Sequence, residues 1–207
     1  SHYELINAKK FVKEKKIDLR NFEKLKKEVV KFKPDIIFHL AAQAIVSKSF
    51  VKPNYTWTSN VNGTINIIES TRCLKKKCTL ILITSDKCYE NRETHVGYKE
   101  TDRLGGIDPY SASKASADIA IRSYFESFLK NDKKILLGVG RAGNVIGGGD
   151  WASNRLIPDC IRSTSLSKKM EIRNPNSTRP WQHVLEPLSG YINLAYSLSK
   201  NKKLNGE

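Results

Sequence analysis

Long apolar runs are missing from this 207-residue sequence, and so is any pattern typical of a membrane span. A span needs about 18 or more uncharged apolar residues, and no stretch approaches that length. The N-terminal residues SHYELINAKK carry charge and lack an apolar centre, which is not the pattern of a signal peptide. We therefore expect a cytoplasmic protein without a membrane partner.

Cysteine is scarce and scattered. No CxxC pair occurs, and no set of cysteines and histidines has the spacing of zinc ligands. We therefore expect no metal site, and we expect reduced and mostly buried thiols at the four cysteine positions, Cys73, Cys78, Cys88 and Cys160.

Acidic residues are few, 21 against 36 basic ones, so the formal net charge is +15. Nucleic-acid binding is one interpretation of such an excess. Most of the excess is lysine, scattered over predicted helix faces such as Phe22–Phe32 and turns such as Lys75–Lys77, with no basic stripe between aromatic residues. We therefore expect a solvated lysine-rich surface and no nucleic-acid partner. An anionic substrate would be attracted modestly by the same field.

Predicted helices and strands alternate along the chain. Apolar residues recur at helical spacing in Phe22–Phe32, and Pro34 ends that helix. Short apolar runs predict strands at Asp35–Leu40, which we expect to be buried on both faces, at Thr79–Thr84 and at Ile135–Val139. Further helices are predicted at 58–73, 110–130, 156–165 and 184–199, and Asp108 and Pro109 are expected to start the helix at 110–130.

This alternation predicts an α/β fold with a doubly wound parallel sheet. In such sheets the ligand lies beyond the carboxyl ends of the strands. The small or polar residues that follow each predicted strand are therefore the candidate site, at 41–43, 85–87 and 141–144.

Tyr110 and Lys114 are four residues apart in a predicted helix and so share one face. A lysine ammonium beside a phenol favours the phenolate, which can act as a base toward a hydroxyl. The spacing is common, so on this motif alone an ordinary surface pair is the alternative. Ser85, at the end of a predicted strand, would complete a Ser/Tyr/Lys triad. A turn or helix cap is the alternative role of Ser85 and Asp86.

Several unbroken stretches carry a family resemblance. Four of them, in order, resemble the extended short-chain dehydrogenase/reductases that act on sugar nucleotides, the NAD-dependent epimerase/dehydratase family: HLAAQ (39–43), TSNVNGT (58–64), TSDKCY (84–89) and DPYSASK (108–114). Three more resemble the CDP-glucose 4,6-dehydratases in particular: RAGNVIGGGDW (141–151), RLIPD (155–159) and RPWQHVLEPLSG (179–190).

The resemblance runs from about residue 17 to about residue 196 and implies an NAD-binding Rossmann-like fold. Folds of this kind open with a Gly-rich turn that seats the pyrophosphate, and no such turn occurs before Asp35. We therefore expect the N-terminal strands to be missing from this chain. We expect residues 1–146 to form the central part of the Rossmann-like domain, and 147–207 an incomplete substrate-binding region.

The resemblance also implies a lyase reaction with bound NAD: oxidation at C4 of the glucose, loss of water across C5 and C6, and hydride return to C6. Tyr110, assisted by Lys114 and Ser85, would take the proton of the 4-hydroxyl. In related dTDP-glucose dehydratases the strand-end motif is Thr-Asp-Glu, where this chain has Ser85-Asp86-Lys87. Asp86 can keep the role of acid at the C6 hydroxyl. Lys87 could be the base at C5 only in its neutral form, and pairing with Asp86 or the phosphates is its alternative.

Binding residues follow from the same resemblance. NAD contacts are expected from Asp18, Leu19, Leu40, Ala41, Ala42, Gln43, Thr58, Tyr110 and Lys114. Contacts to CDP-glucose are expected from Ser85, Asn144, Arg155 and Arg179, because an arginine matches a pyrophosphate in charge and geometry. For Asn144 the alternative is a turn residue, and for each arginine a solvated surface group.

Four other polar or aromatic residues have different expectations. Asn60 is expected to be a structural link, and His39 a histidine of the core. For Trp151 and Trp181, contact with the substrate and packing in the core are equally good interpretations. Relatives commonly pair through two helices, so a homodimer through 58–73 and 110–130 is expected.

Two other functions stay open. A 4-epimerase or another nucleotide-hexose dehydratase would use the same scaffold, although an epimerase needs no acid at C6. A non-catalytic basic binding protein is the alternative of another class, and the intact set of Ser85, Tyr110 and Lys114 disfavours it.

Overall fold

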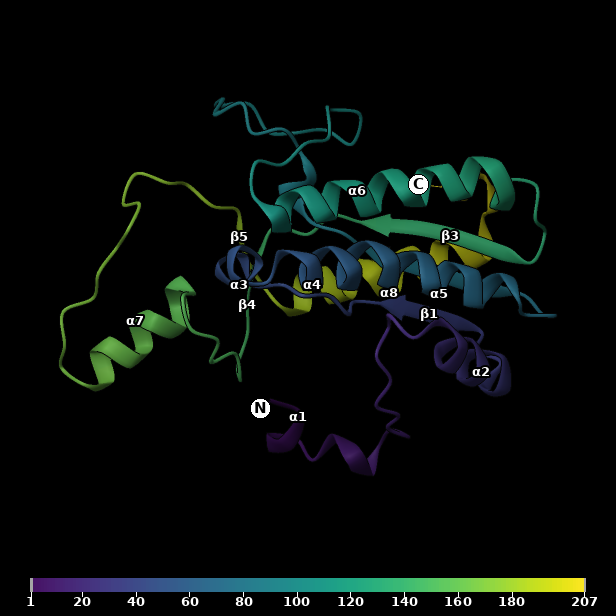
Figure 1. Ribbon diagram of the computed structural model, residues 1–207, viewed down its shortest axis with the longest axis horizontal. Helices are drawn as coiled ribbons and strands as arrows, with labels where there is room; N and C mark the ends of the chain where they lie inside the picture. The colour runs from purple at the N-terminus through teal and green to yellow at the C-terminus, as the bar shows by residue number, and fades with distance from the viewer. Residues whose placement is uncertain (1, 207) are drawn as a thin grey trace. The chain divides into compact units, whose positions relative to one another are not determined.

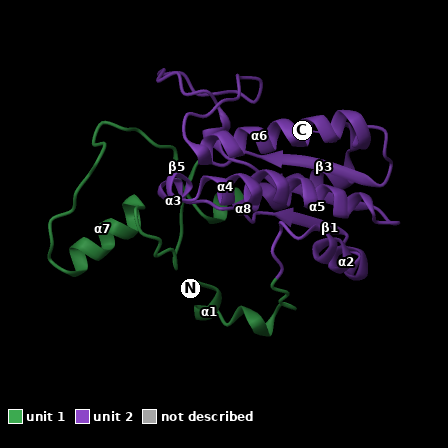
Figure 2. Cartoon of the chain, viewed as in Figure 1, with its two compact units in different colours: residues 1–16, 143–187 green, residues 17–142, 188–207 purple. Residues whose placement is uncertain are grey.

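The computed structural model describes residues 2–206, which form two compact units (Figure 2). Unit 1 combines the chain up to Lys16 with 143–187, and unit 2 combines 17–142 with the chain from 188 onward. The domain division predicted at residue 146 stays a prediction. The compact units separate at 142/143, and the residues after 187 belong to unit 2.

Unit 2 is built on a parallel sheet of three strands in the order β1-β2-β3, which confirms the predicted α/β parallel architecture. The strands are β1 (Ile36–His39), β2 (Cys78–Ile83) and β3 (Ile135–Gly140). Each crossover between neighbouring strands contains helices, as parallel pairing requires. All three carboxyl ends therefore meet at one edge of the sheet.

The predicted helices of unit 2 are present. α2 (Phe22–Phe32) has the predicted bounds, and its N-cap Asn21 accepts a hydrogen bond from the backbone of Lys24. The helix predicted at 58–73 begins earlier and contains a π-helical turn. The short α3 was not predicted from the sequence. The helices of the crossovers and the C-terminal part are α3 (Val46–Val51), α4 (Pro53–Trp57), the π turn η2 (Thr58–Asn62), α5 (Gly63–Arg72), α6 (Pro109–Tyr124), the π turn η4 (Phe125–Leu129), α8 (Leu185–Lys200) and the 3-10 turn η5 (Lys202–Leu204).

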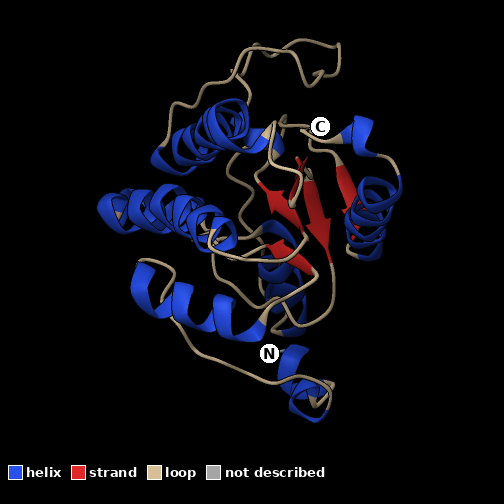
Figure 3. Ribbon diagram, turned by 90° about the vertical axis from the view of Figure 1, so that its right-hand side faces the viewer, coloured by secondary structure: helices blue, strands red, loops and turns tan. Residues whose placement is uncertain are grey.

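The core lies on both faces of β2. Leu80 and Leu82 belong to a cluster that includes Ile67 and Ile68 of α5 and Ile121 of α6. Ile81, which points to the opposite face, packs with Ala195 and Leu198 of α8. In Figure 3 the strands accordingly lie between helices on either side. On this second face a side chain at Gly138 would meet Leu198, so glycine permits the close approach of α8.

β1 departs from the prediction of a strand buried on both faces. Ile37 packs against the larger core cluster and His39 is buried. Ile36 and Phe38, on the other face, are 45% and 39% exposed. The reason is that α8 packs over β2 and β3, through Ile81 and Gly138, and leaves that face of β1 open in the described part of the chain.

Unit 1 contains a two-stranded parallel sheet and short helices. α7 has the bounds that the sequence predicted. The elements of unit 1 are α1 (His2–Leu5), the 3-10 turn η1 (Ala8–Lys10), β4 (Asn144–Ile146), β5 (Trp181–His183) and α7 (Leu156–Ser165).

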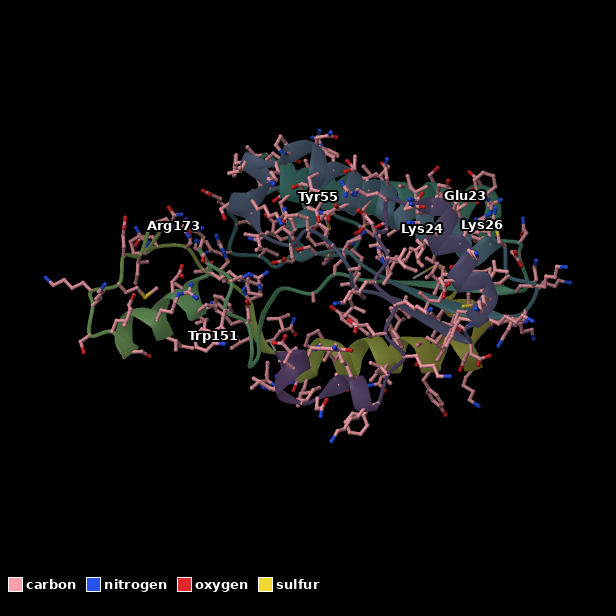
Figure 4. The ribbon with its side chains drawn as sticks, turned by 60° about the horizontal axis from the view of Figure 1, so that its bottom comes forward. Glu23, Lys24, Lys26, Tyr55, Trp151 and Arg173 are labelled. Carbon is pink, nitrogen blue, oxygen red and sulfur yellow. The ribbon has the colours of Figure 1, made fainter. Side chains whose placement is uncertain are left out.

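The lysine excess lies largely at the surface. Lys24 of α2 is exposed and Lys26 lies beside Glu23 on the same helix (Figure 4). Within residues 2–206 no helix is long and apolar enough to cross a membrane, and no cluster of His, Cys, Asp or Glu could hold a metal ion. All four cysteines are free, but only Cys78 and Cys88 are buried, so the expectation of mostly buried thiols was wrong for the other two.

Candidate active site

The carboxyl end of β1 is tied to the helices behind it by Asn60. Its side-chain oxygen accepts from the backbone N–H of Gln43 at 2.8 Å, and its Nδ2 donates to the Gln43 carbonyl and to Ser113 Oγ on α6. Gln43 is itself buried, with its side chain bonded to Ile45 and Thr56. Asn60 is thus the structural link that the sequence predicted. Leu40 and Ala41 are left exposed at this strand end.

The start of α6 is set by Asp108 and Pro109, as predicted. The Asp108 carboxylate accepts hydrogen bonds from the backbone N–H groups of Tyr110 and Ser111, and Pro109 occupies the first turn. This cap places Tyr110 in the first turn of the helix and Lys114 one turn later. Both side chains are buried, with 8% and 7% of their surface exposed.

Lys114 joins α6 to the end of β2. Its Nζ donates to the carbonyl oxygen of Ile83 at 3.1 Å, the one hydrogen bond of its ammonium in the described structure. Burial lowers the pKa of Lys114 to about 8. His39, on β1, has its pKa lowered to about 4 by burial and by the charge of Lys114. The neutral His39 ring bonds Thr64 Oγ1 at 3.2 Å, as expected of a core histidine.

The predicted triad serine begins a 3-10 turn, η3 (Asp86–Cys88), which follows β2 directly. Ser85 Oγ accepts from the backbone N–H of Lys87 and donates to the Asp86 carboxylate at 3.0 Å. Ser85 is therefore both a cap and a buried hydroxyl at the strand end. The turn packs against α6, so the Ser85-Asp86-Lys87 segment and the helix of Tyr110 and Lys114 are neighbours in unit 2.

The other predicted NAD contacts in unit 2 are more dispersed. Asp18 is exposed, and its hydrogen bonds with Arg20 lower the pKa of its carboxyl to about 2. Leu19 packs over Gly63 of α5, and its carbonyl accepts from Asn66 at 2.8 Å. The hydroxyl of Thr58 donates to the carbonyl of Asn54 on its own helix. Ala42 follows the exposed residues Leu40 and Ala41 after the carboxyl end of β1 and is partly buried.

The three predicted substrate residues after 142 belong to unit 1. Asn144 lies in β4, where its backbone N–H donates to the carbonyl of Pro180. Arg155 precedes α7 and forms an ion pair of 2.6 Å with Asp150. Arg179 is exposed and bonds the neighbouring carbonyl of Thr178.

The two tryptophans of unit 1 are also at the surface. Trp151, labelled in Figure 4, is 57% exposed and Trp181 is 40% exposed, which argues against a core-packing role for either.

A further ion pair at the strand ends, between buried Asp118 and partly buried Arg141, was not predicted from the sequence. Arg141 follows β3, and its Nε and Nη2 donate to the two carboxylate oxygens of Asp118 on α6, at 2.8 and 2.7 Å. Thr84 Oγ1 donates to the same carboxylate at 2.9 Å. Nη1 of Arg141 donates to the hydroxyl of Tyr89 and to the carbonyl of Glu100.

A sequence signal for this pair exists. Asp118 is four residues after Lys114 and eight after Tyr110, so it continues the same buried face of α6. An acidic residue at such a position requires a partner. Arg141, directly after an apolar strand, is the basic residue that a parallel sheet would bring to the same edge.

Comparisons with known proteins agree with this architecture. A family model described as GDP-mannose 4,6 dehydratase matches residues 2–202. The chain is 49% identical over 185 residues to CDP-glucose 4,6-dehydratase of Salmonella typhimurium, with 87% of this chain and 52% of the relative covered. It is 32% identical over 126 residues to CDP-paratose 2-epimerase of Salmonella typhi, with 54% and 37% covered. The chain thus spans about half the length of the first of these relatives, and less of the second.

Solved structures share the fold. A double mutant of DesIV, a dTDP-glucose 4,6-dehydratase from Streptomyces venezuelae, with NAD and DAU bound, aligns with a TM-score of 0.74 at 21% identity, covering 88% of this chain and 53% of that one. Pal from Bacillus thuringiensis aligns with a TM-score of 0.77 at 19% identity, covering 92% and 58%.

Proposed function

Because this chain belongs to the family described as GDP-mannose 4,6 dehydratase, we propose that the protein is a sugar-nucleotide 4,6-dehydratase that converts CDP-glucose to CDP-4-keto-6-deoxyglucose with bound NAD. The nucleotide is proposed from the 49% identity to the Salmonella typhimurium CDP-glucose enzyme. The observation that carries the reaction type is the buried pair Tyr110 and Lys114 on α6, packed beside the turn of Ser85, Asp86 and Lys87.

Tyr110 is proposed to take the proton of the sugar 4-hydroxyl. A phenol becomes an effective base when a cation lies nearby, and the Lys114 ammonium is one helical turn away on the same face. Ser85 would hold the same sugar hydroxyl by a hydrogen bond, because its Oγ lies at the carboxyl end of β2. All three side chains are buried, which strengthens each polar interaction in the site.

The described residues fit one part of a dinucleotide. Lys114 is a buried ammonium with three N–H donors, of which the structure pairs one, so two can serve ribose hydroxyls. The exposed strand-end segment Leu40–Ala41 would lie beside the pyrophosphate, by the family pattern. NAD, when bound, supplies a reversible acceptor for hydride. Asp18, Leu19, Ala42, Gln43 and Thr58 stay proposed contacts.

Asp86 is proposed to protonate the C6 hydroxyl as water leaves, and Lys87 is our candidate for the base at C5. Both side chains are partly exposed on η3, where a sugar could reach them. Asn144, Arg155 and Arg179 are proposed contacts of the nucleotide sugar; an arginine fork suits a pyrophosphate. The cytoplasmic location and the absence of a nucleic-acid partner stay predictions.

The intact protein is incubated with NAD and, in separate reactions, with CDP-glucose, dTDP-glucose, GDP-mannose or UDP-glucose. Only the reaction with CDP-glucose should form a 4-keto-6-deoxy sugar, which is detected by its absorbance after treatment with alkali. Asp86→Asn should lower that rate by about 10²- to 10⁴-fold, because it removes a general acid. Asp132→Asn is the matched control, because Asp132 precedes β3 at the opposite end of the sheet.

Other outcomes discriminate the alternatives. A keto-sugar from a different nucleotide would keep the reaction and exclude the CDP specificity. A sugar of altered stereochemistry without a keto product, unaffected by Asp86→Asn, would indicate a 4-epimerase. No reaction, together with salt-sensitive binding to DNA or RNA, would indicate the basic binding protein.

We also propose a homodimer formed through the helices at 58–73 and 110–130. These helices contact each other in unit 2, so together they can present one surface to a second copy. Apolar side chains remain exposed on this helical layer, with Ile119 of α6 at 57% and Phe128 of η4 at 51%. Large exposed apolar side chains on neighbouring helices are typical of an interface.

Ile119→Asp should shift the intact protein from dimer to monomer in sedimentation velocity, because a carboxylate would be buried in the interface. Ile107→Asp is the matched control, since Ile107 is 99% exposed and lies outside both helices. A dimer that persists in Ile119→Asp at the same affinity would exclude this surface.

A further inference from the structure

The turn that holds Asp86 and Lys87 is flanked by two residues bonded to one ion pair. Before the turn, Thr84 Oγ1 donates to Asp118. After the turn, Tyr89 accepts a hydrogen bond from Arg141 at 3.0 Å, and the Arg141 guanidinium lies 5.1 Å from the centre of the Tyr89 ring. The ion pair therefore contacts both ends of the six-residue span from Thr84 to Tyr89.

Asp118 and Arg141 are suited to hold a fixed geometry. Their contact is bidentate, with both carboxylate oxygens engaged, and their side chains are 7% and 17% exposed. A bidentate arginine–carboxylate pair has one preferred orientation, which a single-point contact lacks. Because the pair is shielded from water, its hydrogen bonds are stronger than those of an exposed pair.

The pair also reaches the loop that follows the turn. Nη1 of Arg141 donates to the carbonyl of Glu100 at 2.9 Å, and the ring of Tyr89 stacks on that of Tyr98 with centroids 5.1 Å apart. Residues 91–100 are exposed, and Figure 1 shows this segment extending from the body of unit 2 near the start of α6. Arg141 is thus a side-chain anchor where a long exposed loop joins the turn, beside the backbone bonds of Glu90 with Arg103 and of Gly105 with Cys88.

The helix of Tyr110 and Lys114 depends less on this pair than the turn does. α6 is capped by Asp108, bonded through Ser113 to Asn60, and bonded through Lys114 to Ile83. The turn is also held by backbone bonds, from the Asp86 N–H to the carbonyl of Ala142 and from the Gly105 N–H to the carbonyl of Cys88. The contacts of the ion pair with Thr84 and Tyr89 fix the two flanks of the turn, so their loss should move Asp86 and Lys87 more than it moves the helix.

We propose that Asp118 and Arg141 are positioning residues that place Asp86 and Lys87 for the loss of water across C5 and C6, rather than for oxidation at C4. This inference rests on the proposed dehydratase function. The pair does not touch the sugar itself; it acts through Thr84 and Tyr89. A displacement of reacting groups by about 1 Å can cost about 10²-fold in rate, so small shifts of the turn suffice.

Arg141→Lys is the first variant, because lysine keeps the charge but cannot form the bidentate contact together with the bonds to Tyr89 and Glu100. In the intact protein with CDP-glucose and NAD, kcat should fall about 10- to 100-fold with little change in KM. Tyr89→Phe removes only the hydroxyl, keeps both ring contacts, and should give a smaller loss in the same direction. Arg92→Lys, in the exposed loop, is the matched control and should keep the wild-type rate.

Isotope effects separate positioning from loss of folded enzyme. With substrate deuterated at C5, the isotope effect on kcat should rise in Arg141→Lys, because removal of the C5 proton becomes slower. With substrate deuterated at C4 it should not rise. A lower kcat with both isotope effects unchanged would mean a merely structural role. A rise at C4 alone would place the effect on Tyr110, and either result would overturn the proposal.

Hydrogen exchange gives a readout that needs no activity. In Arg141→Lys the amides of Asp86 and Cys88, which are hydrogen-bonded in the turn, should exchange faster, while those of Leu80 and Leu82 in β2 stay protected. If the wild-type protein makes no keto-sugar, the proposed function is wrong. The hydrogen-exchange measurement still tests whether the ion pair of Asp118 and Arg141 holds the turn. Unchanged exchange at Asp86 and Cys88 would overturn the positioning role in any case.

Discussion

Tyr110→Phe should abolish most formation of the 4-keto-6-deoxy sugar in the intact protein, lowering the rate with CDP-glucose and NAD by about 10²- to 10⁴-fold. The substitution removes only the phenolic oxygen, the atom proposed to take the proton of the 4-hydroxyl. The ring stays in its buried position, and the backbone N–H of residue 110 keeps its bond to Asp108. The free energy of unfolding should therefore change by no more than about 1 kcal/mol.

The matched control is Tyr191→Phe. Tyr191 is a partly buried tyrosine of α8, whose ring lies against Gly140 on the face of the sheet opposite α6. Its variant should keep the wild-type rate. A Tyr110→Phe protein that is folded by circular dichroism and retains more than about a tenth of the wild-type rate would exclude Tyr110 as the base.

Lys114→Met should lower activity and raise stability at the same time. Activity should fall by about 10²-fold or more, because the cation beside Tyr110 is lost. Burial lowers the pKa of Lys114 from 10.5 to about 8, which corresponds to a cost of about 3 kcal/mol for the buried charge. Methionine avoids that cost but leaves the Ile83 carbonyl without its donor, which costs about 1–2 kcal/mol. The free energy of unfolding near neutral pH should therefore increase by about 1–2 kcal/mol.

The stability difference should depend on pH in a defined direction. Between pH 8 and pH 10.5 the unfolded chain binds a proton at Lys114 that the folded chain does not. This group therefore makes the wild-type protein more stable as the pH rises through that window. Below pH 8 both states are protonated and the full cost is present. The advantage of Lys114→Met should thus be largest near neutral pH and should shrink, then reverse, by about pH 10.5.

Denaturant unfolding of both proteins at about pH 7 and about pH 10 measures this difference, and the other titrating groups, such as His39 and Cys88, are common to both. Lys24→Met, on the exposed surface of α2, is the matched control and should change stability by less than about 0.5 kcal/mol at either pH. A Lys114→Met protein that is destabilised equally at both pH values would show that burying this ammonium costs little.

The local parts of the fold could be predicted because their signals are local. α2 has the predicted bounds because the apolar spacing and the nearby Pro34, from which it was predicted, act within a few residues; the structure adds the cap at Asn21. The start of α6 was predicted from Asp108 and Pro109, which cap it in the structure. The candidate triad was predicted in part from a resemblance, and its chemical roles stay proposals.

The burial of β1 could not be predicted from its own residues. An apolar run such as Asp35–Leu40 is typical of a strand covered on both faces, but the cover is supplied by elements far along the chain. α8, which begins at Leu185, packs over β2 and β3 and leaves Ile36 and Phe38 exposed within the described residues.

The alternation of strands and helices, the parallel sheet, and the positions of Ser85 after a strand and of Tyr110 at a helix start could be read from the residues alone, because periodicity, caps and breakers act within a few residues. Which charges at the strand ends pair depends on the tertiary structure. Asp118 and Arg141 are 23 residues apart, and Arg141 and Tyr89 are 52 apart. Their attraction becomes strong only after folding brings them together and removes water, and no local pattern encodes that distance.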